Sequence, residues 1–126
     1  SYNKWRKIMQ TAERLEQYER ITGREAEDFL ARAVKLVQEN LPEFTEYFPD
    51  SNSEENFYPQ TENREWTTGF WTGEIWLAYE RTKDENLKKA GLLQAKSFLK
   101  RITERVDVDN HDMGFLYTPS CVAAYR

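Results

Sequence analysis

Apolar residues recur every three or four positions along three stretches of the chain, which is the spacing of one face of an α-helix. In residues 3–19 the apolar set is Trp5, Ile8, Met9, Ala12, Leu15 and Tyr18. In residues 24–40 it is Ala26, Phe29, Leu30, Ala33, Val34 and Val37, and in residues 84–105 it is Leu92, Ala95, Leu99 and Ile102, continued by Val106. Gly23 and Pro42 follow the first two stretches, and Asp84 is a suitable N-cap for the third. The pattern predicts three amphipathic helices, and no stretch predicts a strand.

Residues 66–80, "WTTGFWTGEIWLAYE", follow a different pattern, because their apolar side chains lie on every side of a helix. A helix that is apolar all round is typical of a buried position. Gly69 and Gly73 each cost about 1 kcal/mol relative to alanine inside a helix. We therefore expect another backbone, or a ligand, to come close to this helix at the two glycines.

Two further segments complete the predicted fold. Residues 49–65, "PDSNSEENFYPQTENRE", show no period and predict a loop longer than compact domains usually contain without a function. "TPS", residues 118–120, predicts the start of a last helix with Pro119 in its first turn. The order of elements predicts an all-α protein, either a bundle or a barrel of outer amphipathic helices around buried inner ones. The end of the chain at Arg126, barely two turns into that helix, favours a barrel of which residues 1–126 form one part.

Composition excludes several classes of function. The net charge of −4 argues against a nucleic-acid partner, because such proteins concentrate Lys and Arg on one face. The basic residues near the third helix are interleaved with acids, so we expect a solvated helix face there: Lys88, Lys89, Lys96, Lys100, Arg101 and Arg105. One cysteine and one histidine supply neither an internal disulfide nor a zinc site of the usual kind. No stretch has the roughly 18 consecutive apolar residues that cross a bilayer. No leader-like segment opens the chain, so we expect no membrane partner and a cytoplasmic location.

Two places carry candidate chemistry. Trp66 lies where the long loop meets the buried helix, and flat aromatic rings suit the apolar faces of sugars as well as they suit one another. His111 and Asp112 form a potential acid/base pair, but both reach one ligand only if the loop bends, which Gly114 would ease. From these residues alone, a turn closed by Asp112 with a surface histidine is the better interpretation. A dyad of Cys121 with His111 is possible in principle, although nothing else indicates a protease.

Two long motifs, taken together, resemble a known family. "TENREWTTGFWTGEIWLAYE" and, after a spacer helix, "DVDNHDMGFLYTPSCVAAYR" are similar to the unsaturated glucuronyl hydrolases, glycoside hydrolase family 88. That family reads N-T-x-W-T-x-G-F-W-x-G-x-x-W-L, followed some thirty residues later by D-H-H-D-x-G-F-L-Y. The likeness covers residues 62–126 in order and in spacing, whereas residues 24–61 match only in general character.

The resemblance implies a fold and an activity. The fold is an (α/α)6 barrel with its cleft at one end, of which this chain would supply the N-terminal third. The substrates are oligosaccharides left by polysaccharide lyases, such as glycosaminoglycan fragments, with a 4,5-unsaturated uronic acid at the non-reducing end. The reaction hydrates that double bond rather than displacing the glycosidic oxygen. No cofactor or metal is implied, and the missing C-terminal part of the barrel is the expected partner.

The resemblance also assigns site residues. Asp112 matches the family's essential aspartate, His111 its substrate-contacting histidine, Trp66 the tryptophan that lines the subsite for the unsaturated sugar, and Asn63 the asparagine of the same motif. Two positions depart from the family pattern: "NRE" stands where the family has "NTD" or "NTE", and Asn110 replaces a second histidine. Asparagine has no ionisable group, so a role of position 110 in tuning Asp112 is in question. The family's proton-donating aspartate lies beyond residue 126. We therefore expect the 126 residues alone to be inactive. The alternatives are an unsaturated rhamnogalacturonyl hydrolase of the neighbouring family and a non-catalytic helical interaction module.

Overall fold

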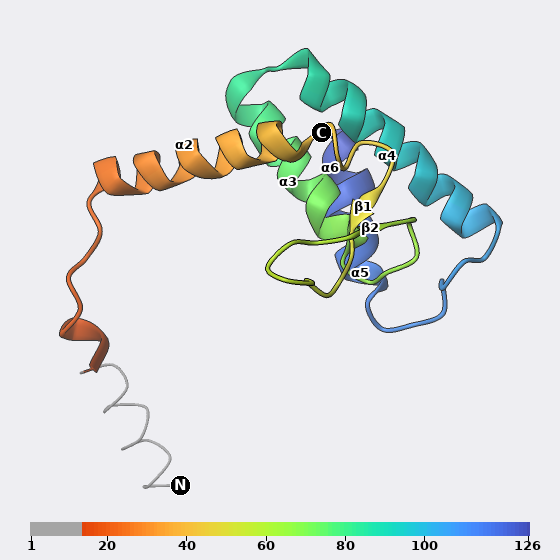
Figure 1. The fold of residues 1–126 in the computed structure, drawn as a ribbon, viewed down its shortest axis with the longest axis horizontal. Helices are drawn as coiled ribbons and strands as arrows, with labels where there is room; N and C mark the ends of the chain where they lie inside the picture. The colour runs from red at the N-terminus through yellow and green to blue at the C-terminus, as the bar shows by residue number, and fades with distance from the viewer. Residues whose placement is uncertain (1–13) are drawn as a thin grey trace, which may run out of the picture. The chain divides into compact units, whose positions relative to one another are not determined.

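The structure, a computed structural model, describes residues 14–126 (Figure 1). The chain divides into two compact units, Ser1–Arg32 and Ala33–Arg126. Most of the helix predicted for residues 3–19 lies outside the described residues. Within them, residues 14–16 are helical and the chain turns before residue 22, so the predicted helix does not reach residue 19.

Helix α2, Gly23–Asn40, confirms the helix predicted for residues 24–40. It begins with a capping box, in which the backbone N–H and the hydroxyl of Thr22 each donate to Glu25 Oε2 at 2.8 Å. The Glu25 N–H donates in return to Thr22 Oγ1 at 3.2 Å. The helix ends two residues before Pro42, which cannot continue it without loss of a hydrogen bond.

The segment after α2 brings two aromatic side chains into the core of the second unit. Phe44 and Phe48 are buried, whereas Tyr47 between them is exposed. Strand β1, Phe48–Pro49, pairs antiparallel with β2, Gln60–Thr61. This short ladder, which the sequence pattern did not predict, closes the long loop at its base and holds Phe48 in place (Figure 1).

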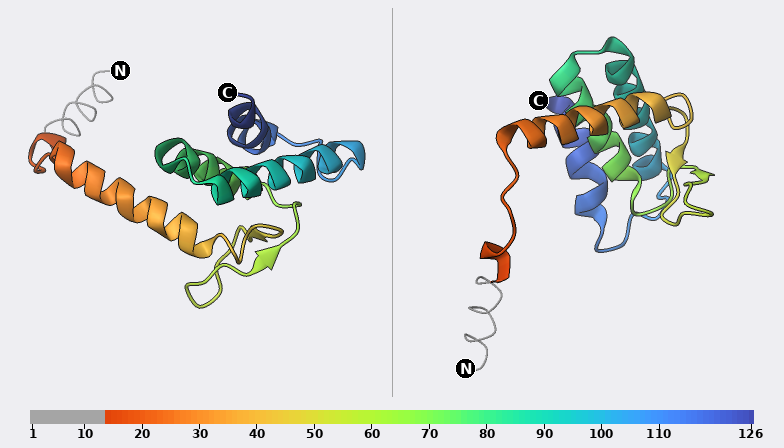
Figure 2. Two further views of the ribbon diagram at one scale, coloured as in Figure 1. Left: turned by 90° about the horizontal axis from the view of Figure 1, so that it is seen from above. Right: turned by 60° about the vertical axis from the view of Figure 1, so that its left-hand side comes forward.

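Helices α3, Thr68–Thr82, and α4, Glu85–Thr103, form a helical hairpin. Lys83 turns the chain with a φ of 59°, and its N–H donates to the Tyr79 carbonyl at 2.7 Å. Asp84 caps α4 as predicted, since its Oδ1 accepts from the Asn86 N–H at 2.9 Å. Figures 1 and 2 show the two helices side by side.

The last helical segment starts earlier than predicted. Helix α5, Met113–Tyr117, runs directly into the π-helical turn η1, Thr118–Val122, and into α6, Ala123–Tyr125. Pro119 therefore lies inside a continuous helical path rather than at its start. Proline has no N–H and its ring crowds the carbonyl four residues earlier, which accounts for the widened turn. The Trp76 indole donates to the Ser120 carbonyl at 2.9 Å, and the Ser120 hydroxyl donates to the Leu116 carbonyl.

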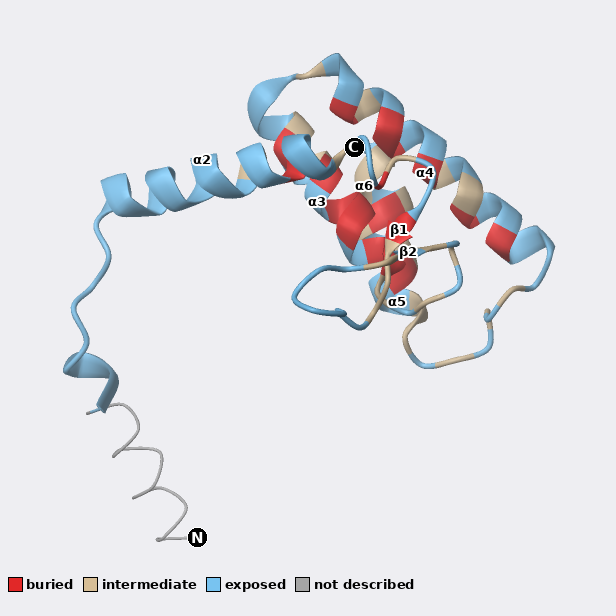
Figure 3. Ribbon diagram, in the orientation of Figure 1, coloured by how far each residue is buried: buried red, intermediate tan, exposed pale blue. Residues whose placement is uncertain are grey.

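The core of the second unit lies where α3 meets α4 and the α5–η1 segment (Figure 3). Its buried apolar residues are Val37, Phe44, Phe48, Trp71, Ile75, Ala78, Leu87, Ala90, Phe98 and Leu116. The prediction that α3 is buried all round is wrong for one face, because Phe70 is 39% and Leu77 66% exposed. None of the described helices is long and apolar enough to cross a membrane.

Candidate functional site

The glycines of α3 bring the two sequence motifs into contact. A Cβ placed on Gly69 would lie 2.5 Å from the Leu116 carbonyl oxygen and would also overlap the Phe115 carbonyl. A Cβ on Gly73 would lie 2.8 Å from the Cβ of Pro119. The expected close approach is therefore made by the backbone of α5 at Gly69 and by the Pro119 ring of η1 at Gly73. The glycine-marked helix thus packs directly on the segment that follows His111.

Three aromatic rings gather at the N-terminal ends of α3 and α5. The ring centroids of Trp66 and Phe70 are 6.1 Å apart, those of Trp66 and Phe115 6.5 Å, and those of Phe70 and Phe115 5.4 Å. All three side chains are exposed. This aromatic cluster, defined as Trp66, Phe70 and Phe115, presents apolar ring surface of the kind on which sugar rings stack. Phe70 and Phe115 were not predicted as site residues, although both are fixed positions of the two motifs.

His111 and Asp112 lie next to this cluster along the chain, immediately before α5. His111 Nε2 is 3.6 Å from Asp112 Oδ1, and the side chains are 94% and 21% exposed respectively. The Asp112 carboxylate makes no capping hydrogen bond to α5. Its backbone carbonyl instead accepts from the N–H groups of Phe115 and Leu116. Asp112 therefore closes the turn before α5 with its backbone, beside an exposed histidine, as the residues alone indicate. Its carboxylate takes no part in capping α5 and faces His111 instead.

The bend that brings His111 and Asp112 together is made by Asn110 rather than by Gly114. The Asn110 amide donates to the Asp107 carbonyl at 3.0 Å, and Asn110 Oδ1 accepts from the Asp112 N–H at 2.9 Å. Asp107 has a positive φ of 47°. Gly114 lies inside α5 with no positive φ, and a Cβ there would meet open space. The predicted bend exists, but its assignment to Gly114 is wrong.

Asn63 occupies a different environment from the other three predicted site residues. Its Oδ1 accepts from the Thr68 hydroxyl at 2.7 Å and from Arg101 Nη1 at 3.2 Å, while its Nδ2 donates to the Ser97 hydroxyl at 2.9 Å. Both ends of the amide are therefore bound within the protein. A substrate contact by Asn63, which stays a prediction, would have to share or release one of these partners.

Arg101 is the residue that sequence reasoning placed wrongly. It was expected on a solvated face, yet it is 2% exposed, at the end of α4. A guanidinium buried to this extent is costly unless its donors are satisfied. Its neighbours Lys100 and Glu104 form the exposed ion pair that the charge pattern indicates, at 3.9 Å. The helical period could have separated Arg101 from Lys100, because it lies on the face of Ala90, Gln94 and Phe98.

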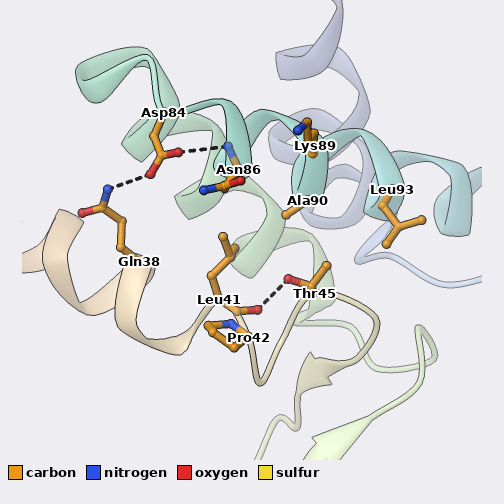
Figure 4. Close-up of a pocket in the computed structure, with 9 residues that line it drawn as sticks. All are labelled: Gln38, Leu41, Pro42, Thr45, Asp84, Asn86, Lys89, Ala90 and Leu93. Carbon is orange, nitrogen blue, oxygen red and sulfur yellow. Dashed lines mark hydrogen bonds between the residues drawn. The ribbon is translucent and has the colours of Figure 1, made fainter.

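Two surface pockets lie away from these residues. One, of about 440 Å³, is lined by the end of α2 and the start of α4 (Figure 4). Gln38 Nε2 donates to Asp84 Oδ2 at 3.0 Å among its lining residues. The other, of about 570 Å³, is lined by α3, α4 and the η1–α6 segment. None of the four predicted site residues lines either one. Among the described residues, no group of three or more His, Cys, Asp or Glu side chains is placed to hold a metal ion.

Comparisons with known proteins agree on one group of relatives. No protein-family model matches the chain. It is 43% identical over 106 residues to an unsaturated chondroitin disaccharide hydrolase of Streptococcus pneumoniae, covering 84% of this chain and 27% of the relative. It is 45% identical over 106 residues to that of Streptococcus agalactiae, with the same coverage. It is 37% identical over 93 residues to the unsaturated glucuronyl hydrolase of a Bacillus species, covering 74% of this chain and 25% of the relative.

Solved structures give the same result. The crystal structure of the unsaturated glucuronyl hydrolase of Streptococcus agalactiae matches with a TM-score of 0.81 and 44% identity, over 86% of this chain and 28% of that one. The Bacillus enzyme matches with a TM-score of 0.69 and 36% identity, over 74% and 25%. Fold and comparisons thus define the class: a mostly helical homologue of saccharide-degrading hydrolases. Within it, the chain is a homologue of the unsaturated glucuronyl and chondroitin disaccharide hydrolases, and it spans 25–30% of their length.

Proposed function

We propose that this chain forms the N-terminal part of an (α/α)6 barrel that hydrolyses unsaturated oligosaccharides. The substrates would be products of polysaccharide lyases, with a 4,5-unsaturated uronic acid at the non-reducing end. The observation that carries the proposal is the position of the Asp112 carboxylate. It makes no capping hydrogen bond to α5, lies beside His111 and precedes Phe115 of the exposed aromatic cluster by three residues. One Streptococcus agalactiae relative has been crystallised with dGlcA-GalNAc6S, and the Bacillus relative is described as responsible for the degradation of glycosaminoglycan.

The reaction adds water across the double bond of a vinyl ether. A proton goes to C4 and a hydroxyl to C5, which makes C5 a hemiketal. The bond from C5 to the ring oxygen then breaks, leaving a ketone next to the carboxylate, and the hemiacetal at C1 releases the remaining saccharide. The unsaturated sugar leaves as an α-keto acid.

The described residues would hold the substrate for this step. Trp66 offers a ring face to the unsaturated sugar. Asp112 is a hydrogen-bond acceptor for a substrate hydroxyl or for the attacking water, and His111, with its exposed imidazole, is within reach of the same ligand. Nothing in this chain is nominated as the proton donor, so the 126 residues alone should have no activity.

The exposed apolar face of α3 and of the last helical segment supports the barrel. Leu77 of α3 and Val122 of η1 are 66% and 51% exposed. Soluble proteins seldom leave large apolar side chains together in water, and such surfaces are typical of contacts with further protein. In a protein of the relatives' length, the remaining inner helices would cover this face, whereas an independent interaction module would bind a separate partner there.

The test uses a protein of the relatives' full length that contains this chain. Turnover of unsaturated chondroitin, hyaluronan and heparin disaccharides is followed by loss of the ultraviolet absorbance of the conjugated double bond. Asp112→Asn should fold normally and lose about 100-fold or more in kcat, the usual range for a residue that directs proton transfer. Asp109→Asn is the matched control, because it makes the same change in the same loop at an exposed position.

Two results would contradict the proposal. Turnover of unsaturated rhamnogalacturonan fragments in place of the uronic-acid disaccharides would move the protein to the neighbouring family. Equal rates for Asp112→Asn and Asp109→Asn would remove Asp112 from the reaction.

A further inference from the structure

Arg101 donates hydrogen bonds in two directions from the end of α4. Its Nε donates to the Val106 carbonyl at 3.0 Å, and its Nη2 donates to the Asp107 carbonyl and carboxylate at 3.2 and 3.3 Å. Its Nη1 donates to the Glu65 carbonyl at 2.9 Å. Every nitrogen of the guanidinium therefore has a partner, which is what its burial requires.

On one side, Arg101 fixes the chain on both flanks of Trp66. Besides the Glu65 carbonyl, Nη1 lies 3.2 Å from Asn63 Oδ1 and 3.4 Å from the Thr68 hydroxyl. The Thr68 hydroxyl in turn donates to Asn63 Oδ1. Trp66 is the residue between these contacts. Its backbone position is therefore set by the guanidinium, even though its own ring is exposed.

On the other side, Arg101 fixes the turn that presents Asp112. The Asp107 carbonyl accepts from both Arg101 Nη2 and the Asn110 amide. Asn110 Oδ1 accepts from the backbone N–H of Asp112. A continuous path of hydrogen bonds thus runs from the guanidinium through Asp107 and Asn110 to Asp112.

The backbone of this turn needs such support. Arg105 and Asp107 have positive φ values of 57° and 47°. Residues other than glycine are strained in this region by roughly 1–2 kcal/mol each, and they stay there only where the surroundings enforce it. The bonds of Arg101 to Val106 and Asp107 lie directly on this segment.

We propose that Arg101 is a positioning residue, which sets the Asp112 turn at a fixed place relative to Trp66. This inference rests on the proposed function, because it assigns Arg101 a part in placing the reacting group against the bound sugar. The planar fork of arginine suits the task, since one group donates to two loops at once in fixed directions. Lysine keeps the charge, but its single ammonium cannot reproduce the fork.

The experiment compares Arg101→Lys with Gln94→Met in the full-length protein. Gln94 is the matched control, because it is 1% exposed on the same helix and bonds to the Thr72 hydroxyl and the Phe44 carbonyl, away from both loops. Arg101→Lys should lower kcat about 10–100-fold with KM changed by less than about threefold, because a displacement near 1 Å costs on the order of 100-fold in rate. Gln94→Met should lower the melting temperature while leaving kcat within about threefold.

A second measurement does not depend on turnover. Amide hydrogen exchange should speed up in residues 62–68 and 104–113 together in Arg101→Lys, and in neither segment in Gln94→Met. Unchanged kcat and exchange in Arg101→Lys, or equal kcat losses in the two variants, would overturn the positioning role. An inactive wild type with the exchange response present would refute the proposed function alone and leave the link between the loops standing.

Discussion

Gly69 is the position at which a single methyl group should separate the two halves of the site. Gly69→Ala places a Cβ 2.5 Å from the Leu116 carbonyl oxygen and 2.6 Å from the Leu116 Cα. These atoms belong to the backbone of α5, so no side-chain rotation relieves the overlap. Since ordinary contacts begin near 3.4 Å, α5 would have to move by about 1 Å relative to α3.

The magnitude follows from two opposing effects. Alanine gains about 1 kcal/mol over glycine in a helix interior, whereas overpacking a filled site costs about 1–3 kcal/mol and more when backbone must shift. We expect a net loss of about 1–2 kcal/mol in the free energy of unfolding. Gly114→Ala is the matched control, because it lies inside α5 with open space around the new Cβ and should gain up to about 1 kcal/mol.

The assay is urea unfolding followed by circular dichroism. The free energies of unfolding of the two variants and the wild type are compared after checking that their m-values agree. In the full-length protein, Gly69→Ala should also lose rate, because α5 begins immediately after Asp112. A Gly69→Ala variant at least as stable as Gly114→Ala would show that α5 can move away from α3 at no cost in stability. The close contact at Gly69 would then not fix α5 against α3.

Two further changes test single side chains. Desolvation by the surrounding protein raises the pKa of Glu74. The folded protein therefore binds this proton more tightly than the unfolded chain and loses stability as the pH rises above the ordinary glutamate pKa of about 4.3. Glu74→Gln should therefore raise the melting temperature at pH 7 and not below pH 4, and an equal effect at both would contradict the desolvation. Asn63→Ala removes one hydrogen bond each from Thr68, Ser97 and Arg101. The loss of these three bonds should cost about 1–3 kcal/mol in unfolding free energy, measured in urea. A higher KM with unchanged stability would instead make Asn63 a substrate contact.

The helices that the sequence predicted are those whose ends carry local signals. Asp84 bonds to the N–H of Asn86 two residues later, and Pro42 prevents α2 from continuing, so both boundaries depend on neighbouring residues alone. The start of the last helix was misplaced because Pro119 is normally an N-terminal residue. Here tertiary contacts override that preference: Trp76 bonds to the Ser120 carbonyl, and Gly73 lets Pro119 pack against α3.

The site residues likewise divide into those that local motifs predict and those that depend on tertiary contacts. Trp66, His111 and Asp112 could be found from two motifs, and the structure brings the two motifs together at Gly69 and at the aromatic cluster. Asn110 could not be identified as the residue that makes the bend, because its bonds to Asp107 and Asp112 depend on a positive φ that no local pattern indicates. The helical period could have placed Arg101 on the buried face of α4, but its partners at Asn63 and Glu65 could not be predicted, because they lie far from it along the chain.

The spacing between the two motifs has a geometric cause. α3 has 15 residues and α4 has 19, which at 1.5 Å per residue makes them about 22 and about 28 Å long. The chain leaves the site along α3, turns at Lys83 and returns along α4, so the longer return helix carries its last turn back level with Thr68, where α3 began. Arg101 can bond to both loops because α4 is long enough to bring it back to the start of α3. The separation of the motifs is thus the length of a helical hairpin, and the residue at its returning end is the one placed to join the motifs together.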